Sequence, residues 1–397
     1  MDTLILGSGK SGVAAHKFLL SLGEKSIIYD DFLKQITLEE IEKTSFKQAI
    51  ISPGFSPDHK VVRYLNTKGI PIIGEMELGL RYTKTPCVAV TGTNGKTTVC
   101  LIASFILNQW GVKTKAVGNV GVPLTEYLLQ DDPAQLLILE TSSYQLETMQ
   151  SNNIEFGLIL NITPHHLDRY DSFLHYVNTK MKLAKLVKKD CFVIKHVYEL
   201  FQQSITNVKI IPDLFFSSLR KDLLQENLCA AFTICNQFGV TKEFFENSLV
   251  DFQKPEHRLE WVASISGRNF YNDSKATNVS ATIKAVESFQ QKIILIAGGY
   301  DCLGDFSKWT GSFSTKVKKM YCYGDAAKKI FHQLKNTVDV EVLDNLEACV
   351  KKAYEISLVK DVILLSPGCP SFGCFKNYEQ RGEAFKNYIK ALKKRML

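Results

Sequence analysis

The sequence lacks the features that would identify several common classes of protein. Its 10 cysteines form no C-x-x-C pair and show no spacing typical of metal ligands, so nothing indicates a cysteine-ligated metal. No apolar run approaches the length of a membrane span, and no secretory leader, internal repeat or low-complexity tract is visible. We therefore expect a cytoplasmic protein with reduced thiols and no membrane insertion.

A large excess of one charge is also absent. The formal net charge of +7 is modest for 397 residues, and the basic residues are dispersed along the chain. Clusters such as Lys188-Lys189 have the composition of solvated helix ends, so nucleic-acid binding is not expected. The small surplus would suit small anionic substrates. The length is sufficient for two or three domains, each with its own core.

The stretch from Val88 to Cys100, VAVTGTNGKTTVC, is the most informative part of the chain. Its apolar start predicts a buried strand at Cys87–Val90, and a helical pattern runs from Lys96 to Trp110. Between them, Gly92 and Gly95 would let backbone N–H groups converge on an anion at the helix N-terminus. This arrangement predicts a phosphate-binding loop.

The residues after the second glycine indicate a nucleoside triphosphate site. Lys96 would reach the β- and γ-phosphates, and the Thr97 hydroxyl would ligate Mg²⁺. The loop is two residues shorter than the usual G-x-x-x-x-G-K-[ST], because Val90 occupies the position of its first glycine. The alternative is a helix N-terminus with ordinary turn glycines.

Another glycine-rich turn, Gly7–Gly12, follows a short predicted strand at Thr3–Leu6. A helical pattern and a second strand, Ser26–Tyr29, come next and end at Asp30, about 20 residues after the glycines. This is the layout of a Rossmann-like βαβ unit. Its ligand is either a dinucleotide, as in a nicotinamide-dependent oxidoreductase, or another nucleotide diphosphate.

Polar residues follow two further predicted strands. Glu140 ends the strand Leu136–Leu139, where a Mg²⁺ ligand or a water-orienting group belongs, and a surface or helix-capping glutamate is the alternative. His165 and His166 follow the strand Phe156–Ile162. Because neighbouring residues cannot both face one point on a regular element, at most one of them is expected to be a ligand.

Two helical residues carry weaker signals. Lys180 lies in the predicted helix Phe173–Val187, where a lysine is usually solvent-facing. Asn227 lies in a helix that begins near Leu223, and its amide could read a base edge.

Strands alternate with helices in the C-terminal part, as at Leu346–Ile356 and Val362–Leu365, which predicts a parallel sheet with helices on both faces. The expected fold class is therefore α/β, with three consecutive domains built on mainly parallel sheets. These are a Rossmann-like domain at 1–84, a central P-loop-type ATPase domain at 85–253 and a Rossmann-like domain at 254–397.

The motifs TGTNGKTT, GNVG, LETSSYQLE, NITPHHLDRY, ENLCAAF, EHR, NDSKATN and SPGCPSF…KNYEQRG occur in one order. With them, the chain closely resembles the Mur ligase family of peptidoglycan synthesis over essentially its whole length. The NDSKATN and C-terminal motifs are similar to those of the members that add D-glutamate to UDP-N-acetylmuramoyl-L-alanine. The resemblance implies an ATP-dependent amide ligase that forms an acyl phosphate, and we expect it to be a monomer.

The resemblance also implies a role for individual residues. ATP would contact Gly92, Thr93, Asn94, Gly95, Lys96, Thr97, Thr98, Asn227, His257, Arg258 and Asp273. The UDP-linked substrate would contact Ser8, Gly9, Asp30, Ser52, Gly54 and Asn119. D-glutamate would contact Lys275, Thr277, Ser371, Phe372 and Tyr378, the last two through backbone N–H groups. Two Mg²⁺ ions would be held by Thr97, Glu140, His166 and a carbamoylated Lys180, which together with Lys96 form the implied catalytic set.

One position departs from the family pattern. Where the family usually has a lysine that pairs with the glutamate side chain, this chain has Cys302. A lost charge-assisted hydrogen bond costs about 1.5–3 kcal/mol, or roughly tenfold to a hundredfold in affinity. Either Lys275 or another cation compensates, or D-glutamate binding is weaker or less selective.

The motifs are also compatible with two other functions. The first glycine turn would suit a nicotinamide-dependent oxidoreductase, and the phosphate loop alone would suit a non-catalytic nucleotide switch. For the ligase, the base that deprotonates the incoming amine is either His166 or a carboxylate.

Overall fold

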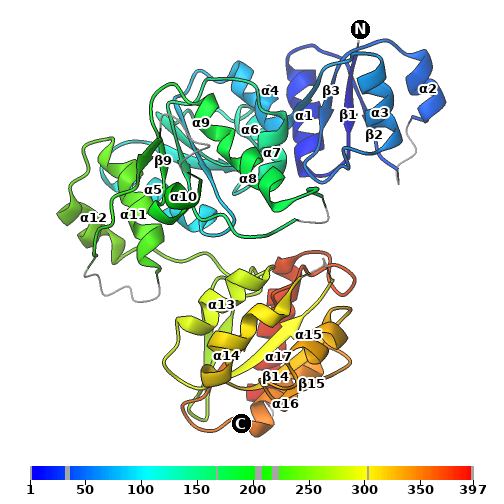
Figure 1. The fold of residues 1–397 in the computed structure, drawn as a ribbon. Helices are drawn as coiled ribbons and strands as arrows, with labels where there is room; N and C mark the ends of the chain where they lie inside the picture. The colour runs from blue at the N-terminus through cyan, green and yellow to red at the C-terminus, as the bar shows by residue number, and fades with distance from the viewer. Residues whose placement is uncertain are drawn as a thin grey trace. The chain divides into compact units, whose positions relative to one another are not determined.

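The computed structural model describes residues 2–31, 36–166, 169–201, 208–216, 223–301 and 304–394. Three sheets with flanking helices run along the chain, as Figure 1 shows. The contacts divide the chain into two compact units, which are described separately. Unit 1 consists of Met1–Ile162 and Leu174–Phe252, and unit 2 consists of Thr163–Phe173 and Gln253–Leu397.

The first sheet, in unit 1, is parallel and has the order β2-β1-β3-β4. Its strands are β1 (Asp2–Leu6), β2 (Ser26–Tyr29), β3 (Phe46–Ile51) and β4 (Ile72–Gly74), with helices α1 (Lys10–Ser21), α2 (Leu38–Lys43) and α3 (Lys60–Thr67). Successive residues of β1 alternate between the two faces, so that Leu4 and Leu6 join one core and Ile5 joins the other. The predicted Rossmann-like βαβ unit is confirmed.

The second sheet, also in unit 1, is parallel and has the order β10-β9-β8-β5-β7-β6. Its strands are β5 (Cys87–Thr91), β6 (Thr114–Gly118), β7 (Leu136–Glu140), β8 (Phe156–Ile159), β9 (Cys191–Val193) and β10 (Val208–Ile210). Helix α4 (Glu75–Tyr82) packs against β3 and β4 of the first sheet. The helices that belong with the second sheet are α5 (Lys96–Gln109), α6 (Leu124–Tyr127), α7 (Ser143–Thr148), α8 (Phe173–Met181), α9 (Leu183–Leu186), α10 (Lys195–Phe201), α11 (Gln225–Asn236) and α12 (Lys242–Leu249).

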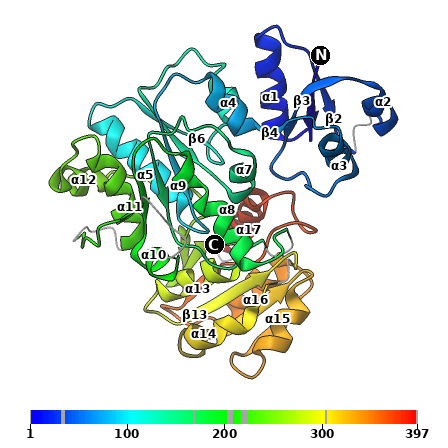
Figure 2. The same ribbon diagram turned by 45° about the horizontal axis from the view of Figure 1, so that its top comes forward.

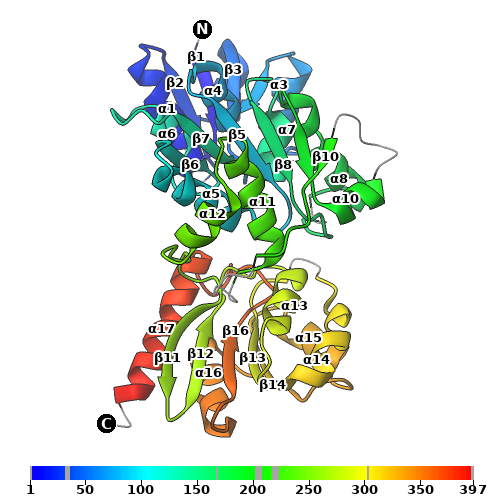
Figure 3. The ribbon, with the colours of Figure 1, turned by 90° about the vertical axis from the view of Figure 1, so that its left-hand side faces the viewer.

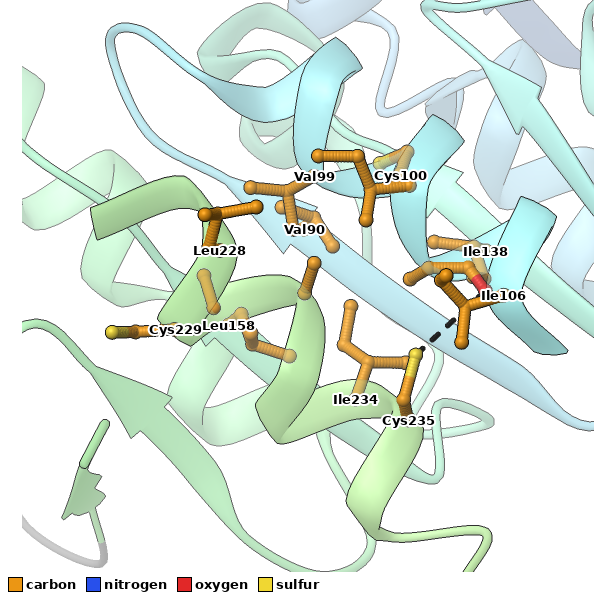
Figure 4. Close-up of a cluster of buried hydrophobic side chains, with 14 of the residues drawn as sticks. Val90, Val99, Cys100, Ile106, Ile138, Leu158, Leu228, Cys229, Ile234 and Cys235 are labelled. Carbon is orange, nitrogen blue, oxygen red and sulfur yellow. Dashed lines mark hydrogen bonds between the residues drawn. The ribbon is translucent and has the colours of Figure 1, made fainter. Parts of the chain in front are cut away.

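All five residues of β5 are buried, because helices and neighbouring strands cover it on every side. Helices α5 and α11 pack together over this sheet, as Figure 2 shows. Figure 4 shows the resulting core, in which Val99 of α5 and Leu228 of α11 lie beside Val90 of β5. This packing fixes the start of α5, and with it the end of the glycine loop that precedes the helix.

Two predicted elements of this part end earlier than expected. The strand predicted to run to Ile162 ends at Ile159, because the backbone of Asn161 accepts a hydrogen bond from Thr93 in the glycine loop. The single helix predicted over Phe173–Val187 is divided into α8 and α9.

The third sheet, in unit 2, has the order β11-β12-β16-β13-β14-β15. Its strands are β11 (Glu260–Ile265), β12 (Arg268–Asn272), β13 (Ile293–Gly298), β14 (Val317–Tyr323), β15 (Val340–Val342) and β16 (Val362–Leu365). Its helices are α13 (Val279–Glu287), the 3₁₀ helix η2 (Phe306–Trp309), α14 (Thr310–Lys316), α15 (Ala327–Leu334), α16 (Leu346–Ile356) and α17 (Tyr378–Lys394). Apolar cores lie on both faces of this sheet, so the prediction of helices on both sides is confirmed.

The prediction of a parallel sheet was wrong at one edge of unit 2. Strands β11 and β12 are antiparallel and form a hairpin, which Figure 3 shows beside α17. Ser266 and Gly267 connect them, both with positive φ, as a type I′ turn requires. A two-residue connection is too short for the crossover that parallel neighbours need.

Among the described residues, no helix is long and apolar enough to cross a membrane.

A buried carboxyl group joins α4 to α6 in unit 1. Glu75 is 3% exposed, and its Oε1 accepts hydrogen bonds from the N–H of Thr125 at 2.6 Å and from its hydroxyl at 2.7 Å. Burial raises the pKa of Glu75 to about 7, against the lowering effect of these two bonds.

Replacing Glu75 with Gln should therefore reduce the dependence of stability on pH. The native state of the parent keeps a proton that the unfolded chain has lost between about pH 4.5 and 7, so its unfolding free energy falls as pH rises through that window. Gln keeps the acceptor oxygen and never ionises. Urea denaturation should show that Glu75→Gln gains about 1–3 kcal/mol over the parent between pH 5 and pH 8. The exposed neighbour Glu126→Gln is the control, and an equal gain there would contradict the assignment.

Candidate active site

The glycine loop between β5 and α5 has the backbone that a phosphate cradle needs. Gly92 and Gly95 have φ values of 150° and 88°, which residues other than glycine rarely adopt. A Cβ at Gly92 would press into Leu160, and a Cβ at Gly95 would overlap Oδ1 of Asn227. Both glycines are therefore required by conformation and by space. The amide groups at the start of α5 lie at its positive end, where an anion is favoured.

Lys96 folds back over this loop. Its Nζ donates to the carbonyl oxygens of Gly92 and Thr93, each at 2.9 Å. The ammonium group therefore stands at the mouth of the cradle, where a nucleotide phosphate would replace carbonyl oxygens as its partner.

Glu140 is joined to two other expected site residues. Its carboxylate is 2% exposed and accepts from the Thr97 hydroxyl at 2.6 Å and from Nδ2 of Asn119 at 2.7 Å. The alternatives of a surface or helix-capping glutamate are wrong, because strand β7 ends with this residue pointing at the start of α5. A hydroxyl and a carboxylate side by side are oxygen donors of the kind that Mg²⁺ prefers. Asn119, expected at the sugar substrate, lies at the same carboxylate.

Lys180 is buried rather than solvent-facing, so the expectation drawn from its helix was wrong. It is 1% exposed, and its Nζ donates to the carbonyl of Gly92 at 2.9 Å and lies 4.8 Å from the ring centroid of Tyr176. Burial, and then the charge of Lys96, hold the pKa of Lys180 well below its usual value, against the opposite effect of Glu140. The spacing of Tyr176, Val177 and Lys180 places the lysine on the apolar face of α8, a signal available in the sequence.

Asn161 belongs to the site, although the motif analysis gave it no role. Its Oδ1 accepts from the N–H of Asn94 at 3.0 Å, and its Nδ2 donates to the carbonyl of Asn94 at 3.2 Å and to Glu226 at 3.1 Å. It therefore braces the glycine loop against α11, the helix that carries Asn227. It lies near the carboxyl end of the strand predicted at Phe156–Ile162, and a polar residue at that end is the sequence signal that could have identified it.

The two adjacent histidines lie in unit 2, whereas the glycine loop lies in unit 1. The rings of His165 and His166 contact each other edge to face, with centroids 3.7 Å apart. His166 has a φ of 58°, an unusual conformation for a residue with a side chain. Its role as a metal ligand stays a prediction.

Five of the six residues expected at the UDP-linked substrate, all except Asn119, lie at the carboxyl ends of the first sheet. Asp30 accepts through one oxygen from both the N–H of Ser8, at 2.9 Å, and its hydroxyl, at 2.6 Å. Gly9 caps the start of α1, and the Ser52 hydroxyl donates to the carbonyl of Gly7 at 3.3 Å. Gly54, two residues further on, has open space around its Cα.

Three residues expected at the nucleotide lie together in unit 2. His257 is buried with a φ of 64°, and its Nδ1 lies 2.8 Å from Nδ2 of Asn272. Asp273 accepts from the N–H of Leu259 at 3.2 Å and from the hydroxyl of Ser366 at 2.8 Å. Burial raises the pKa of Asp273 to about 7. Arg258 directly follows His257 in the chain.

The residues expected at D-glutamate come from two loops of unit 2. Nζ of Lys275 lies 3.7 Å from the ring centroid of Tyr378, close enough for a cation–π contact. Ser371 is buried and Phe372 is exposed. Thr277 is partly buried in the loop that leads to α13, and Cys302 lies outside the described residues.

Known proteins resemble the chain in both sequence and fold. Residues 90–272 match the Mur ligase middle domain, and residues 257–369 match the Mur ligase glutamate ligase domain. Proteins named UDP-N-acetylmuramoylalanine--D-glutamate ligase are similar to it. The one from Protochlamydia amoebophila is 36% identical, and the one from Caldanaerobacter subterraneus is 34% identical, each over 98% of both chains.

Solved structures share the fold at lower identity. A MurF ligase from Thermotoga maritima in complex with ADP has a TM-score of 0.61 at 15% identity, over 98% of this chain and 95% of its own. A pseudomurein peptide ligase type C from Methanothermus fervidus has a TM-score of 0.62 at 16% identity, over 99% and 100%. The domain matches and the full-length relatives lead to one conclusion: the chain belongs to the Mur ligase family.

Proposed function

We propose that this chain adds D-glutamate to UDP-N-acetylmuramoyl-L-alanine with ATP, through an acyl phosphate, and releases ADP and phosphate. The names of the full-length relatives support the two substrates. The observation that carries the ATP chemistry is the convergence of Lys96, Lys180 and the Thr97–Glu140 pair on one glycine loop. No observation on this chain favours a nicotinamide-dependent oxidoreductase.

The three sheets support the proposed division into a UDP-substrate domain at 1–84, an ATP domain at 85–253 and an amino-acid domain at 254–397. In this division, the glycine turn with Ser8 and Asp30 grips the UDP part. The loop after β5 holds ATP, and the loops around Lys275 and Ser371 receive D-glutamate.

Amide formation from a carboxylate needs a better leaving group than oxide. Transfer of the γ-phosphoryl group of ATP to the carboxylate gives an acyl phosphate, which the amine of D-glutamate attacks with loss of phosphate. Phosphoryl transfer depends mainly on alignment and on stabilisation of negative charge. The start of α5 and the Lys96 ammonium group would supply both, since each faces the cradle already.

The side chains at the loop fit bound magnesium. The Thr97 hydroxyl and Glu140 carboxylate are hard oxygen ligands, and we propose that they hold one Mg²⁺ and that a carbamate on Lys180 is a ligand of a second. When bound, these ions supply positive charge that neutralises the phosphate oxygens and orients the substrate carboxylate.

Carbamoylation of Lys180 suits its surroundings. The neutral amine adds to CO₂, the new N–C bond forms and one proton leaves, which converts a neutral amine into an anion. Only the neutral amine can react, and burial of Lys180 beside the charge of Lys96 favours that form. The resulting carboxylate would be an oxygen ligand that plain lysine cannot provide.

Trapping with hydroxylamine tests the proposed function. ATP and UDP-N-acetylmuramoyl-L-alanine together should give the hydroxamate of the sugar-peptide acid without D-glutamate, because the acyl phosphate forms before the amine attacks. Phosphate release that needs no acceptor would instead favour a nucleotide switch. A preparation that ligates but never yields the hydroxamate would overturn the acyl-phosphate route.

Replacing Lys180 with Ala should abolish ligation, and a small added carboxylate such as formate should restore part of it. The cavity left by the side chain is buried at Gly92, where the added carboxylate could stand in for the carbamate. Initial rates with and without formate are the measurement. The exposed Lys185→Ala on the next helix should ligate normally, and full activity of Lys180→Ala without formate would contradict the carbamate.

Asn161→Ala should weaken ATP binding roughly tenfold or more, because it removes the two side-chain hydrogen bonds to Asn94, each worth about 1 kcal/mol. Calorimetric titration with a non-hydrolysable ATP analogue measures the loss. Affinity for the UDP substrate should be unchanged, since the side chain of Asn161 bonds to Asn94 and Glu226 rather than to any residue expected at that substrate.

A matched pair of variants tests whether the loop depends on the hydrogen bond that Asn161 donates to Glu226. Asp at position 161 could still accept from Asn94 but would face the Glu226 carboxylate, now 3.1 Å from a donor nitrogen. Asn161→Asp should therefore bind ATP as poorly as Asn161→Ala, and adding Glu226→Gln should recover part of the affinity by supplying a donor, while the bond to the Asn94 carbonyl stays lost. A double variant no better than Asn161→Asp would refute this account of the loop.

A further inference from the structure

Arg381 is a charged residue that the proposed mechanism does not use. It lies in the first turns of α17, and its side chain is 0% exposed, which makes it one of the largest fully buried side chains described. In the sequence it belongs to the motif KNYEQRG. Figure 3 shows α17 alongside the β11–β12 edge of the unit 2 sheet.

The guanidinium group ties together two loops that follow neighbouring strands. Nε donates to the Ser274 hydroxyl oxygen at 2.9 Å, and Nη2 donates to the carbonyl of Ser274 at 2.7 Å, in the loop after β12. Nη1 donates to the carbonyl of Cys369 at 3.0 Å, in the loop after β16. Backbone from a third loop also approaches, because a Cβ at Gly299 would come within 3.1 Å of Nη1.

These loops carry the residues expected at D-glutamate. Lys275 directly follows Ser274, and Ser371 lies two residues after Cys369. The Ser274 hydroxyl accepts from Arg381 and donates its own proton to the carbonyl of Tyr378 at 2.8 Å. One fork of N–H groups therefore fixes the backbone on either side of the amino-acid site.

The charge of Arg381 is not neutralised by a bonded acid. In the described part of the chain, its hydrogen bonds go to hydroxyl and carbonyl oxygens rather than to a carboxylate, and the hydroxyl of buried Tyr323 also lies beside it. Burial lowers the pKa of Arg381, although a guanidinium group stays protonated in proteins. A buried cation without a counter-ion is costly, and an apolar side chain of the same volume would usually be cheaper. An arginine at this position therefore indicates that its charge, or its planar set of N–H donors, has a function there.

We propose that Arg381 is a positioning and specificity residue of the amino-acid site. Its guanidinium group holds the loops of Lys275, Ser371 and Tyr378 in register, and its buried charge favours an amino acid that carries a second carboxylate. The proposal rests on the proposed function, because it assumes that these loops bind the incoming amino acid. It assigns no contact between Arg381 and the substrate.

Three variants separate the effect of the guanidinium hydrogen bonds, here called the fork, from the effect of the positive charge. Arg381→Lys keeps the charge and loses the fork, Arg381→Met removes both at similar volume, and Ser274→Ala removes one acceptor. Lys390→Met, an exposed position on the same helix, is the matched control. The measurements are KM and kcat for D-glutamate and D-glutamine, KM for ATP, and hydroxamate formation without any amino acid.

Arg381→Lys should raise KM for D-glutamate about tenfold and keep the preference for D-glutamate over D-glutamine, and Ser274→Ala should raise it about threefold to tenfold. Arg381→Met should raise KM about a hundredfold and reduce the preference at least tenfold. KM for ATP and hydroxamate formation should stay within about twofold of the parent in all of them. Lys390→Met should match the parent throughout.

KM for D-glutamate within twofold of the parent in Arg381→Lys and Ser274→Ala would overturn the proposal, and these two variants decide it if Arg381→Met does not fold. A loss of hydroxamate formation parallel to the loss of ligation would also overturn it, because the effect would then be a general one on the fold. If the parent itself forms no hydroxamate, the proposed function has failed rather than the role of Arg381.

Discussion

The carbonyl oxygen of Gly92 is the point on which the rest of the central site depends. It accepts hydrogen bonds from the side chains of both Lys96 and Lys180. Two ammonium groups that share one oxygen would repel each other strongly in a buried site, and this repulsion favours loss of the proton from the more buried one. In the proposed reaction, Lys96 would remain the cation for phosphate, and the more deeply buried Lys180 would be the neutral amine that reacts with CO₂.

The strand order of the second sheet makes this convergence possible. Strand β5 lies between β8 and β7, and all three run in the same direction. Their carboxyl ends therefore deliver Asn161, the glycine loop and Glu140 to one edge, as ligand sites in parallel sheets require. Helix α5 begins at the same edge and brings Thr97 to Glu140. The parallel arrangement thus brings together side chains from distant parts of the chain, which no single local segment could supply.

Unit 2 is also built on a mainly parallel sheet, but its loops need a different means of support. The residues proposed to bind the amino acid lie mainly on loops, which have no regular hydrogen bonding of their own and need another means of support. A buried arginine is well suited to this purpose, because its planar donors can satisfy several carbonyl groups at once in a fixed geometry. The hydrogen bonds of Arg381 to Ser274 and Cys369 replace the ladder that the loops lack. Such a support also places a charge where the incoming amino acid is expected.

The sequence by itself determined the features that depend on local pattern. Alternating apolar runs indicated the strands, and the glycines around Lys96 indicated the loop, because backbone conformations with positive φ are restricted to few residue types. The helical spacing of Lys180 and the position of Asn161 near a strand end were weak signals, but only the tertiary structure decided the burial of Lys180, the role of Asn161 and the antiparallel pairing of β11 with β12. A side chain's solvation and its hydrogen-bond partners depend on elements far away in the chain, whose approach no local spacing specifies.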